Sequence, residues 1–369
     1  MVLADLGADV LKVEPPGGDP SRAWGPQRHN PSGESSPFGG YFASVNRNKR
    51  SVCLDLALPA GREALLGLLS GADVLVENFR VGVMERFGLS YEVIHERFPK
   101  LVYACIRGFG DPRTGASPYA HWPAFDIIAQ AVGGLLSVTG SDADHPVKVG
   151  PGVGDIFPGV LAAVGVLAAV RHAEATGEGQ FVDVAMYDAV LSLSERIVYQ
   201  HSMTGTSPEP QGNTHPLLCP YGLLATEDGF AAVAAPSDHH WRLLSEIIGL
   251  PELALDARFA TNAARLQHSS QIYAILETWS RQRPTAEVIT ALAGLVPCGP
   301  LNDATAIAAD PHVAAREMLV ELAHPAGGTV TVAGCPIKLS VTPSRVDKRA
   351  PLLGEHNDAV LTGPSRGTW

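Results

Sequence analysis

The residue best placed to do chemistry in this chain is Asp155. It follows a glycine-rich turn that contains Gly150, Gly152 and Gly154, and it precedes an apolar run from Val160 to Val170. The run is rich in Ala and Leu, which predicts a buried helix. Asp155 then occupies the expected N-cap position, where free N–H groups and the helix dipole keep a carboxylate ionised and fixed. The pattern makes Asp155 a candidate catalytic group.

The structural alternative is that Asp155 only caps the helix. The three glycines argue against this alternative, because they remove side chains that would block a ligand and a cap alone does not need them. A nicotinamide site is not indicated either, since Asp155 stands where the dinucleotide fingerprint requires its third glycine. The turn therefore predicts a carboxylate that a ligand can approach.

The overall composition is typical of a globular protein without nucleic-acid or membrane partners. The chain has 369 residues, long enough for one large domain and a smaller one, and its formal net charge of -11 argues against polyanionic partners. The longest apolar run, 160–170, is too short to span a membrane, and the first residues lack the basic region of a signal peptide. We expect a cytoplasmic protein.

The five cysteines predict neither a metal site nor disulfides. They are scattered, without a C-x-x-C pair or a nearby histidine, at Cys53, Cys105, Cys219, Cys298 and Cys335. We expect them to be small buried residues.

Strands and helices alternate in the first half of the chain, which predicts a parallel α/β sheet. Strands are expected at 10–14, 51–56, 73–78, 101–110 and 180–186. Ligands bind beyond the carboxyl ends of such strands, where Asn78 and Phe79 follow the third strand. Helices are expected from Pro59 to about Gly71 and from Asp188 to about His201.

The composition changes in the second half. Residues 203–216 are rich in Gly, Pro, Ser and Thr, which indicates a linker. A hairpin is then predicted over 221–235, turning at Asp228-Gly229, followed by helices at 238–249, 269–282 and 284–295. These segments predict a separate α+β unit, after which two more strands are expected.

A series of motifs, in one order along the chain, resembles the class III coenzyme A transferases, the family of formyl-CoA, carnitine-CoA and succinyl-CoA:dicarboxylate transferases. The motifs include L-G-A-D-V-L-K-V-E-P-P, N-R-N-K-R-S-V-C-L-D-L, D-V-L-V-E-N-F-R, F-D-I-I-A-Q-A-V-G-G, G-D-I-F-P-G, T-G-E-G-Q, P-C-G-P-L-N and P-L-L-G-E-H.

The resemblance implies a doubly wound parallel-sheet large domain formed by both termini, a smaller central α+β domain and an interlocked homodimer. On this chain the large domain covers 1–202 and 326–369, the linker 203–220 and the small domain 221–325. The chain opens inside the helix that follows the family's first strand. We therefore expect the sheet to lack an inner strand.

The resemblance also implies an exchange of thioesters. The family's nucleophile is the aspartate of a G-D-x-x-x-G motif, which here is Asp155, followed by Gly159. It attacks the acyl carbon of an acyl-CoA, forms a mixed anhydride and becomes an aspartyl-CoA thioester, from which a small carboxylic acid receives the CoA. CoA thioesters are then substrates, succinyl-CoA is the donor expected by analogy, and no metal or permanent cofactor is implied.

The family pattern also assigns CoA contacts. It maps adenine and phosphate contacts onto Leu54, Asn78, Phe79 and Arg86, and the pantetheine side onto Ala124, Phe125 and Asp126. Arginine suits a phosphate because its planar fork grips two oxygens at once. A solvated helix face is the alternative for Arg86. Arg22, Lys49 and Arg80 are lesser phosphate candidates.

Two alternative functions stay open. The family's racemase branch places a histidine immediately before the aspartate that is Asp126 here, and this chain has Phe125 instead. Without a second base across the α-carbon, racemisation is not favoured. A non-catalytic CoA-binding scaffold is the other alternative, which the missing first strand would favour.

Overall fold

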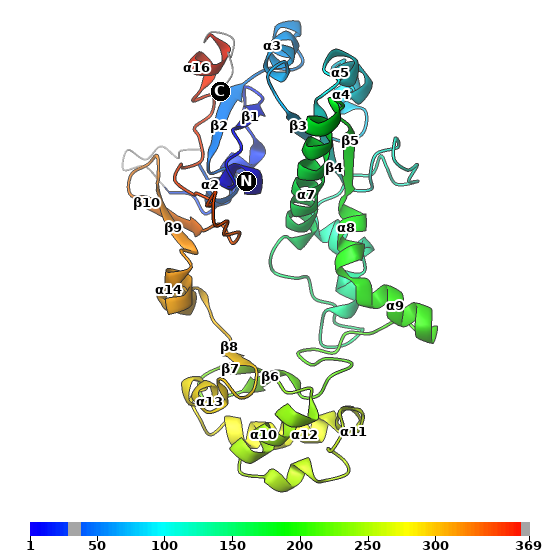
Figure 1. Ribbon diagram of the computed structural model, residues 1–369, viewed down its shortest axis with the longest axis vertical. Coiled ribbons are helices and arrows are strands. Elements are labelled where there is room, and N and C mark those ends of the chain that lie inside the picture. Colours follow the sequence, from blue (N-terminus) through cyan, green and yellow to red (C-terminus); the bar gives the residue numbers. More distant parts are fainter. Residues whose placement is uncertain (29–37, 363–369) are drawn as a thin grey trace. The chain divides into compact units, whose positions relative to one another are not determined.

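The computed structural model describes residues 1–28 and 38–362, and the chain divides into two compact units (Figure 1). Unit 1 comprises 1–133, 151–193 and 308–369, so both ends of the chain belong to it. Unit 2 comprises 134–150 and 194–307. The predicted domains, 1–202 with 326–369 and 221–325, stay a prediction, and their parts at 29–37 and 363–369 lie outside the described residues.

Parallel strands form the frame of unit 1, as predicted. β1 (Val10–Glu14) pairs with β2 (Lys49–Cys53), and a second sheet has the order β3-β4-β5, made of Val74–Glu77, Val102–Arg107 and Phe181–Ala185. The parallel α/β class is therefore confirmed. Among the described residues of unit 1, the parallel strands form two separate sheets, β1-β2 and β3-β4-β5. The predicted doubly wound fold would place them in a single sheet.

The helices of unit 1 cover these sheets. Their apolar side chains, such as Leu65 and Leu69 of α3, pack with Tyr103 and Cys105 of β4 in a buried cluster. The helices are α1 (Val2–Asp5), α2 (Gly40–Val45), α3 (Pro59–Leu69), α4 (Val83–Arg86), α5 (Tyr91–Arg97), α6 (Asp126–Val132), α7 (Val153–Thr176) and α8 (Met186–Leu193). Pro59 begins α3, where its missing N–H costs nothing.

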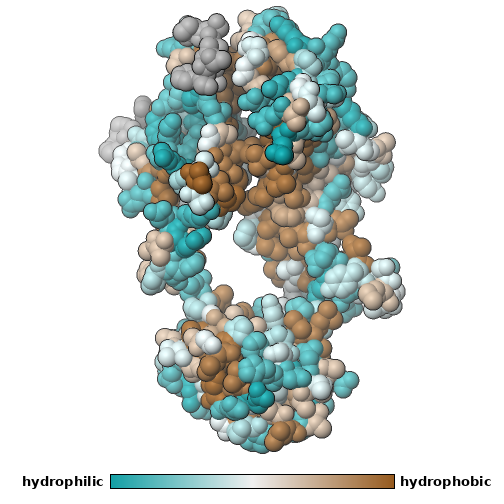
Figure 2. Space-filling model, viewed as in Figure 1, coloured by the Kyte–Doolittle hydropathy of each residue, from teal (hydrophilic) through white to brown (hydrophobic). Residues whose placement is uncertain are grey.

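The long helix α7 positions the candidate nucleophile, and it is less buried than predicted. One face packs on β4, β5, α6 and α8, and it buries Val166, Ala169 and Ala173. The other face exposes Ile156, Val160, Val164 and Leu167, and Figure 2 shows hydrophobic surface where Figure 1 draws this helix. The expected buried helix is thus buried on one side only.

The length of α7 also corrects an expectation. It runs for 24 residues, because the helix continues on both sides of the apolar run 160–170. By length and composition alone, α7 could cross a membrane. This contradicts the prediction that no apolar run is long enough to span one. One such helix is weak evidence of a span, since helices in protein cores pass the same test.

Unit 2 contains the predicted hairpin and a small antiparallel sheet. β6 (Tyr221–Ala225) and β7 (Phe230–Ala234) form the hairpin, and β8 (Cys298–Pro300) pairs with β7. Trp241, Leu244 and Leu276 are among the side chains of its buried core. Its helices are α9 (Glu195–Thr204), α10 (Asp238–Ile247), α11 (Asn262–Gln267), α12 (Ser269–Ser280) and α13 (Thr285–Leu292).

The predicted helix 188–201 is wrong as a single element. It breaks at Ser194, whose φ of -94° and ψ of 35° are not helical, so that α8 and α9 are separate. The chain ends with α14 (Ala304–Ala309), α15 (Pro311–Ala315), the antiparallel pair β9 (Leu319–Ala323) and β10 (Thr329–Ala333), and α16 (Asn357–Leu361).

Candidate active site

Asp155 lies in the first turn of α7 but does not cap it. Gly152 is the N-cap residue, so Asp155 is the third residue of the helix. The N-cap prediction is therefore wrong. Its cause is that Gly154, which looks like the last residue of a turn, is accommodated inside the helix.

The cap comes instead from Asp126, the first residue of α6. The buried Gly154 N–H donates a hydrogen bond of 2.8 Å to Asp126 Oδ1, and Gln130 Nε2 donates to both carboxylate oxygens at 2.9 and 3.0 Å. A Cβ on Gly154 would lie 2.5 Å from the carbonyl oxygen of Asp126. The close contact between α6 and α7 therefore requires a glycine at position 154. We expected this glycine to leave room for a ligand, and the structure gives it a packing role.

Asp155 itself is accessible. Its side chain is exposed, yet enough protein surrounds it that partial burial raises its pKa, and the negative charge of Asp126 raises that pKa further. A raised pKa makes the ionised carboxylate a stronger base and nucleophile than an ordinary surface aspartate. The geometry therefore provides an approachable carboxylate on a fixed helix start.

Tyr41 lies near the candidate site, and sequence reasoning did not single it out. Burial raises its pKa, and the charges of Asp155, Asp19 and Asp126 raise it further, so its hydroxyl lies within electrostatic reach of both site aspartates. Its ring packs against Trp24, with centroids 5.2 Å apart, and both side chains are exposed. The signal available in the sequence was an aromatic pair next to two glycines in F-G-G-Y-F.

Of the residues predicted to bind the adenine and phosphates of CoA, Leu54 follows β2, and Asn78 and Phe79 follow β3. Phe79 is 42% exposed, and its N–H donates to Glu77 Oε2 at 2.6 Å, which holds the turn after β3. Arg86 ends α4 and is exposed, as a phosphate ligand must be. The side chain of Leu54 is buried in the core.

The residues predicted to line the pantetheine lie beside the end of β4. A Cβ on Gly108 would be 2.4 Å from Ala124 Cβ, so the loop before α6 runs directly against that strand end. Phe125 is the N-cap of α6 and is 68% exposed. Through Asp126, this loop is joined to the start of α7 and hence to Asp155.

Two arginines of unit 1, one of them the lesser phosphate candidate Arg22, form buried ion pairs that serve the fold. Arg22 is buried against Glu14 at 2.7 Å, and Arg47 is buried against Asp5 at 2.7 Å. Arg22 is therefore wrong as a phosphate candidate, because its guanidinium is enclosed and paired. Lys49 donates a hydrogen bond to Asn46. Its pKa is lowered to about 8, mainly by burial and also by the nearby positive charge of Lys12.

Neither a metal site nor a disulfide is present in the described part of the chain. Within residues 1–28 and 38–362, no group of three or more His, Cys, Asp and Glu side chains is arranged to hold a metal ion. All five cysteines are free thiols, and Cys105, Cys219 and Cys335 are buried.

Comparison with known proteins extends over almost the whole chain. The family model described as CoA-transferase family III matches residues 1–357. The succinyl-CoA:mesaconate CoA-transferase of Haloarcula hispanica is 47% identical over 369 residues, covering 100% of this chain and 92% of that protein. The succinate–glutarate CoA-transferase of Agrobacterium fabrum is 38% identical over 362 residues, covering 98% and 90%.

The fold agrees with a solved relative. The crystal structure of a CAIB/BAIF family protein from Brucella suis has a TM-score of 0.85 and 36% sequence identity to this chain, covering 98% of this chain and 93% of that one. The family match, the named relatives and the shared fold all point to one assignment. This chain belongs to CoA-transferase family III and is a class III CoA-transferase.

Proposed function

We propose that this enzyme transfers CoA from succinyl-CoA to a short dicarboxylic acid, with Asp155 as the nucleophile. The observation that carries the proposal is an exposed carboxylate of raised pKa, held at the start of α7. The choice of donor and acceptor is supported by relatives named for succinyl-CoA, mesaconate, succinate and glutarate.

In the proposed reaction, an Asp155 oxygen attacks the thioester carbonyl of succinyl-CoA. The C–S bond breaks, a mixed anhydride forms and the CoA thiolate leaves. The thiolate then attacks the aspartyl carbonyl, which releases succinate and leaves an aspartyl-CoA thioester. The carboxylate of the acceptor acid attacks that thioester, and the same steps in reverse give the new acyl-CoA and free Asp155.

The protein must supply position rather than strong intrinsic reactivity. A carboxylate is a weak nucleophile, and fixing it against a thioester is worth effective molarities of roughly 10⁵ to 10⁸ M. The cap from Asp126 fixes the first turn of α7, and with it the backbone that carries Asp155.

The racemase and scaffold alternatives receive less support. The relatives compared above are named as transferases, and Phe125 occupies the position where the racemase branch has its histidine. We further propose that the enzyme is a cytoplasmic homodimer. The exposed apolar face of α7 supports the dimer, because a contiguous apolar surface of this kind is typical of an interface.

The test is the Asp155→Ala variant, incubated with succinyl-CoA and ¹³C-labelled mesaconate. We expect CoA transfer to be lost while CoA binding persists, and the covalent adduct that mass spectrometry detects on the wild-type protein to be absent. Asp188→Ala is the matched control, because Asp188 is also exposed, in the first turn of α8, and its pKa is raised by partial burial. Substantial turnover by Asp155→Ala would refute the mechanism.

A further inference from the structure

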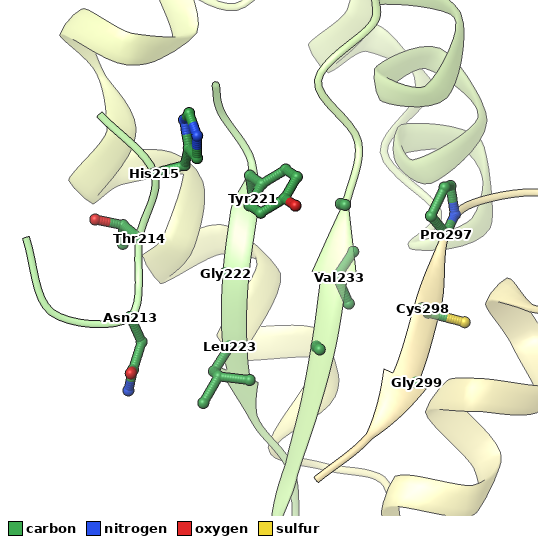
Figure 3. Close-up of a pocket in the computed structure, with 12 residues that line it drawn as sticks. Asn213, Thr214, His215, Tyr221, Gly222, Leu223, Val233, Pro297, Cys298 and Gly299 are labelled. Carbon is green, nitrogen blue, oxygen red and sulfur yellow. The ribbon is translucent and has the colours of Figure 1, made fainter. Parts of the chain in front are cut away.

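Three buried charged residues form a network at the carboxyl end of the sheet β3-β4-β5. Glu77 is the last residue of β3, Arg107 is the last residue of β4, and Asp111 follows four residues later. Arg107 Nη2 donates to Glu77 Oε1 at 2.8 Å, and Arg107 Nη1 donates to the Asp111 carboxylate. These side chains, the Arg107 network, are at most 4% exposed. They share no residue with the pocket on strands β6, β7 and β8 of unit 2 (Figure 3).

Glu77 holds the segment that follows β3. Its two carboxylate oxygens have different partners, because Oε1 accepts from Arg107 while Oε2 accepts from the N–H of Phe79 at 2.6 Å. Charge-assisted hydrogen bonds of this kind are strong, and the buried guanidinium keeps the carboxylate in place. The ring of Phe79, which is 42% exposed, is therefore presented from a fixed backbone. Asn78 and Phe79 are the predicted contacts for the adenine end of CoA.

Asp111 holds the loop that follows β4. Its N–H donates to Asp183 Oδ2 of β5 at 2.8 Å, and its carboxylate also pairs with Arg113 at 3.2 Å. The start and the end of this loop are in contact, since a Cβ on Gly108 would lie 2.4 Å from Ala124 Cβ. Fixing the start of the loop therefore also places its end, which carries the predicted pantetheine contacts 124–126.

A purely structural ion pair is the alternative, and unit 1 contains one for comparison. Arg47 lies 2.7 Å from Asp5, and both side chains are at most 3% exposed. Their further side-chain hydrogen bonds include those to Asn48 and to the Ser44 carbonyl, which are not predicted CoA contacts. Glu77, in contrast, bonds directly to a predicted contact residue. The Arg107 network also lies at the edge of a parallel sheet where ligands bind.

We propose that Glu77 and Arg107 are positioning residues for CoA, which hold the adenine segment 78–79 and the pantetheine segment 124–126 at a fixed spacing. The inference rests on the proposed function and on the predicted CoA contacts, because the spacing matters only if both segments bind one CoA molecule. Both side chains are buried away from the reacting atoms. The Arg107 network therefore sets the affinity for CoA and leaves kcat at saturating substrate unchanged.

Glu77→Gln tests the positioning role with a side chain of nearly the same size. Its amide has one oxygen where the carboxylate has two, so either the Phe79 N–H or Arg107 loses its acceptor. We expect the Kd for CoA to rise about 10-fold, the factor for one lost charge-assisted hydrogen bond, with kcat at saturating succinyl-CoA unchanged. Asp5→Asn is the matched control. It also breaks a buried ion pair, so it should lower the midpoint of urea unfolding and leave the Kd for CoA unchanged.

The double variant Glu77→Leu/Arg107→Leu separates positioning from stability. It removes both charges of the pair, so its midpoint of urea unfolding should exceed that of Arg107→Leu, which leaves a buried carboxylate without its partner. The Phe79 N–H still lacks its acceptor, and Asp111 keeps Arg113 but loses its link to β4. CoA should therefore still bind about 10-fold more weakly than to the wild type, or worse. ADP, which carries the adenine and diphosphate of CoA, reaches only the first segment, so its Kd should rise by a smaller factor.

The outcomes separate this inference from the proposed function. The inference is overturned if Glu77→Gln binds CoA as tightly as Asp5→Asn does, or if the double variant binds CoA like the wild type. Equal factors for ADP and CoA in the double variant also overturn it, because the network then does not hold the loop after β4. If Glu77→Gln does not fold, the double variant alone decides. A wild-type protein that binds CoA without transferring it sinks only the proposed function, whereas transfer with an unchanged Kd for CoA in both variants sinks the inference alone.

Discussion

The contact between Asp126 and the start of α7 gives the sharpest prediction about the active site. In Asp126→Ala, the Gly154 N–H loses its acceptor, which costs about 1 kcal/mol for a helix cap. The buried amide of Gln130 loses a charged partner, which costs about 1–3 kcal/mol more. We expect urea unfolding to show a total loss of about 2–4 kcal/mol, a large part of the ~5–15 kcal/mol that stabilises a typical domain.

Asp126→Asn separates charge from shape. Its amide oxygen can still accept from Gly154, so this variant should be more stable than Asp126→Ala. The negative charge that raises the pKa of Asp155 is removed, so that pKa falls towards its ordinary value. The nucleophile must be ionised, and its ionised form then persists to lower pH. We therefore expect the acidic limb of the kcat–pH profile to move to lower pH.

The assay is kcat for succinyl-CoA-dependent transfer across the acidic range, with CoA affinity measured in parallel. Asp188→Asn is the control, since it removes an exposed carboxylate from the first turn of another helix of unit 1. If the acidic limb of Asp126→Asn coincides with that of the wild type, Asp126 does not set the pKa of Asp155. If Asp126→Ala unfolds at the wild-type urea concentration, Asp126 does not hold the start of α7.

Two further substitutions test the CoA side of the site. Arg86→Ala should weaken CoA binding, while kcat at saturating substrate changes little. The control Arg97→Ala, at another exposed arginine, should leave both the Kd for CoA and kcat unchanged. An unchanged Kd for CoA in Arg86→Ala excludes the phosphate contact. In Arg107→Leu, the buried carboxylate of Glu77 loses its ion-pair partner. Burial already raises the pKa of Glu77, and we expect the free energy of unfolding to fall by about 3–5 kcal/mol. Calorimetry that shows no loss in Arg107→Leu would contradict this account of the turn before Phe79.

The elements that local patterns specify were predictable, and those that depend on distant partners were not. The alternation of apolar strands and helices predicted β1 to β5, and Asp228-Gly229 predicted the hairpin of β6 and β7. The start of α7 could not be predicted, because its cap comes from Asp126, which lies far away in the sequence. Nothing in the residues around Asp155 shows that a carboxylate from another helix satisfies the Gly154 N–H.

The same reasoning explains which charges the sequence misassigned. A basic side chain next to a glycine-rich loop resembles a phosphate ligand whether or not a carboxylate faces it. Arg22 pairs with Glu14, eight residues before it, and Ser51 donates to the same carboxylate. The Ser51 bond to this carboxylate forms because strands β1 and β2 lie side by side. Arg86 differs from Arg22 in this respect, since it is exposed and no carboxylate of the described chain pairs with it. An arginine that faces no carboxylate is available to a phosphate, whereas a buried and paired arginine such as Arg22 is not.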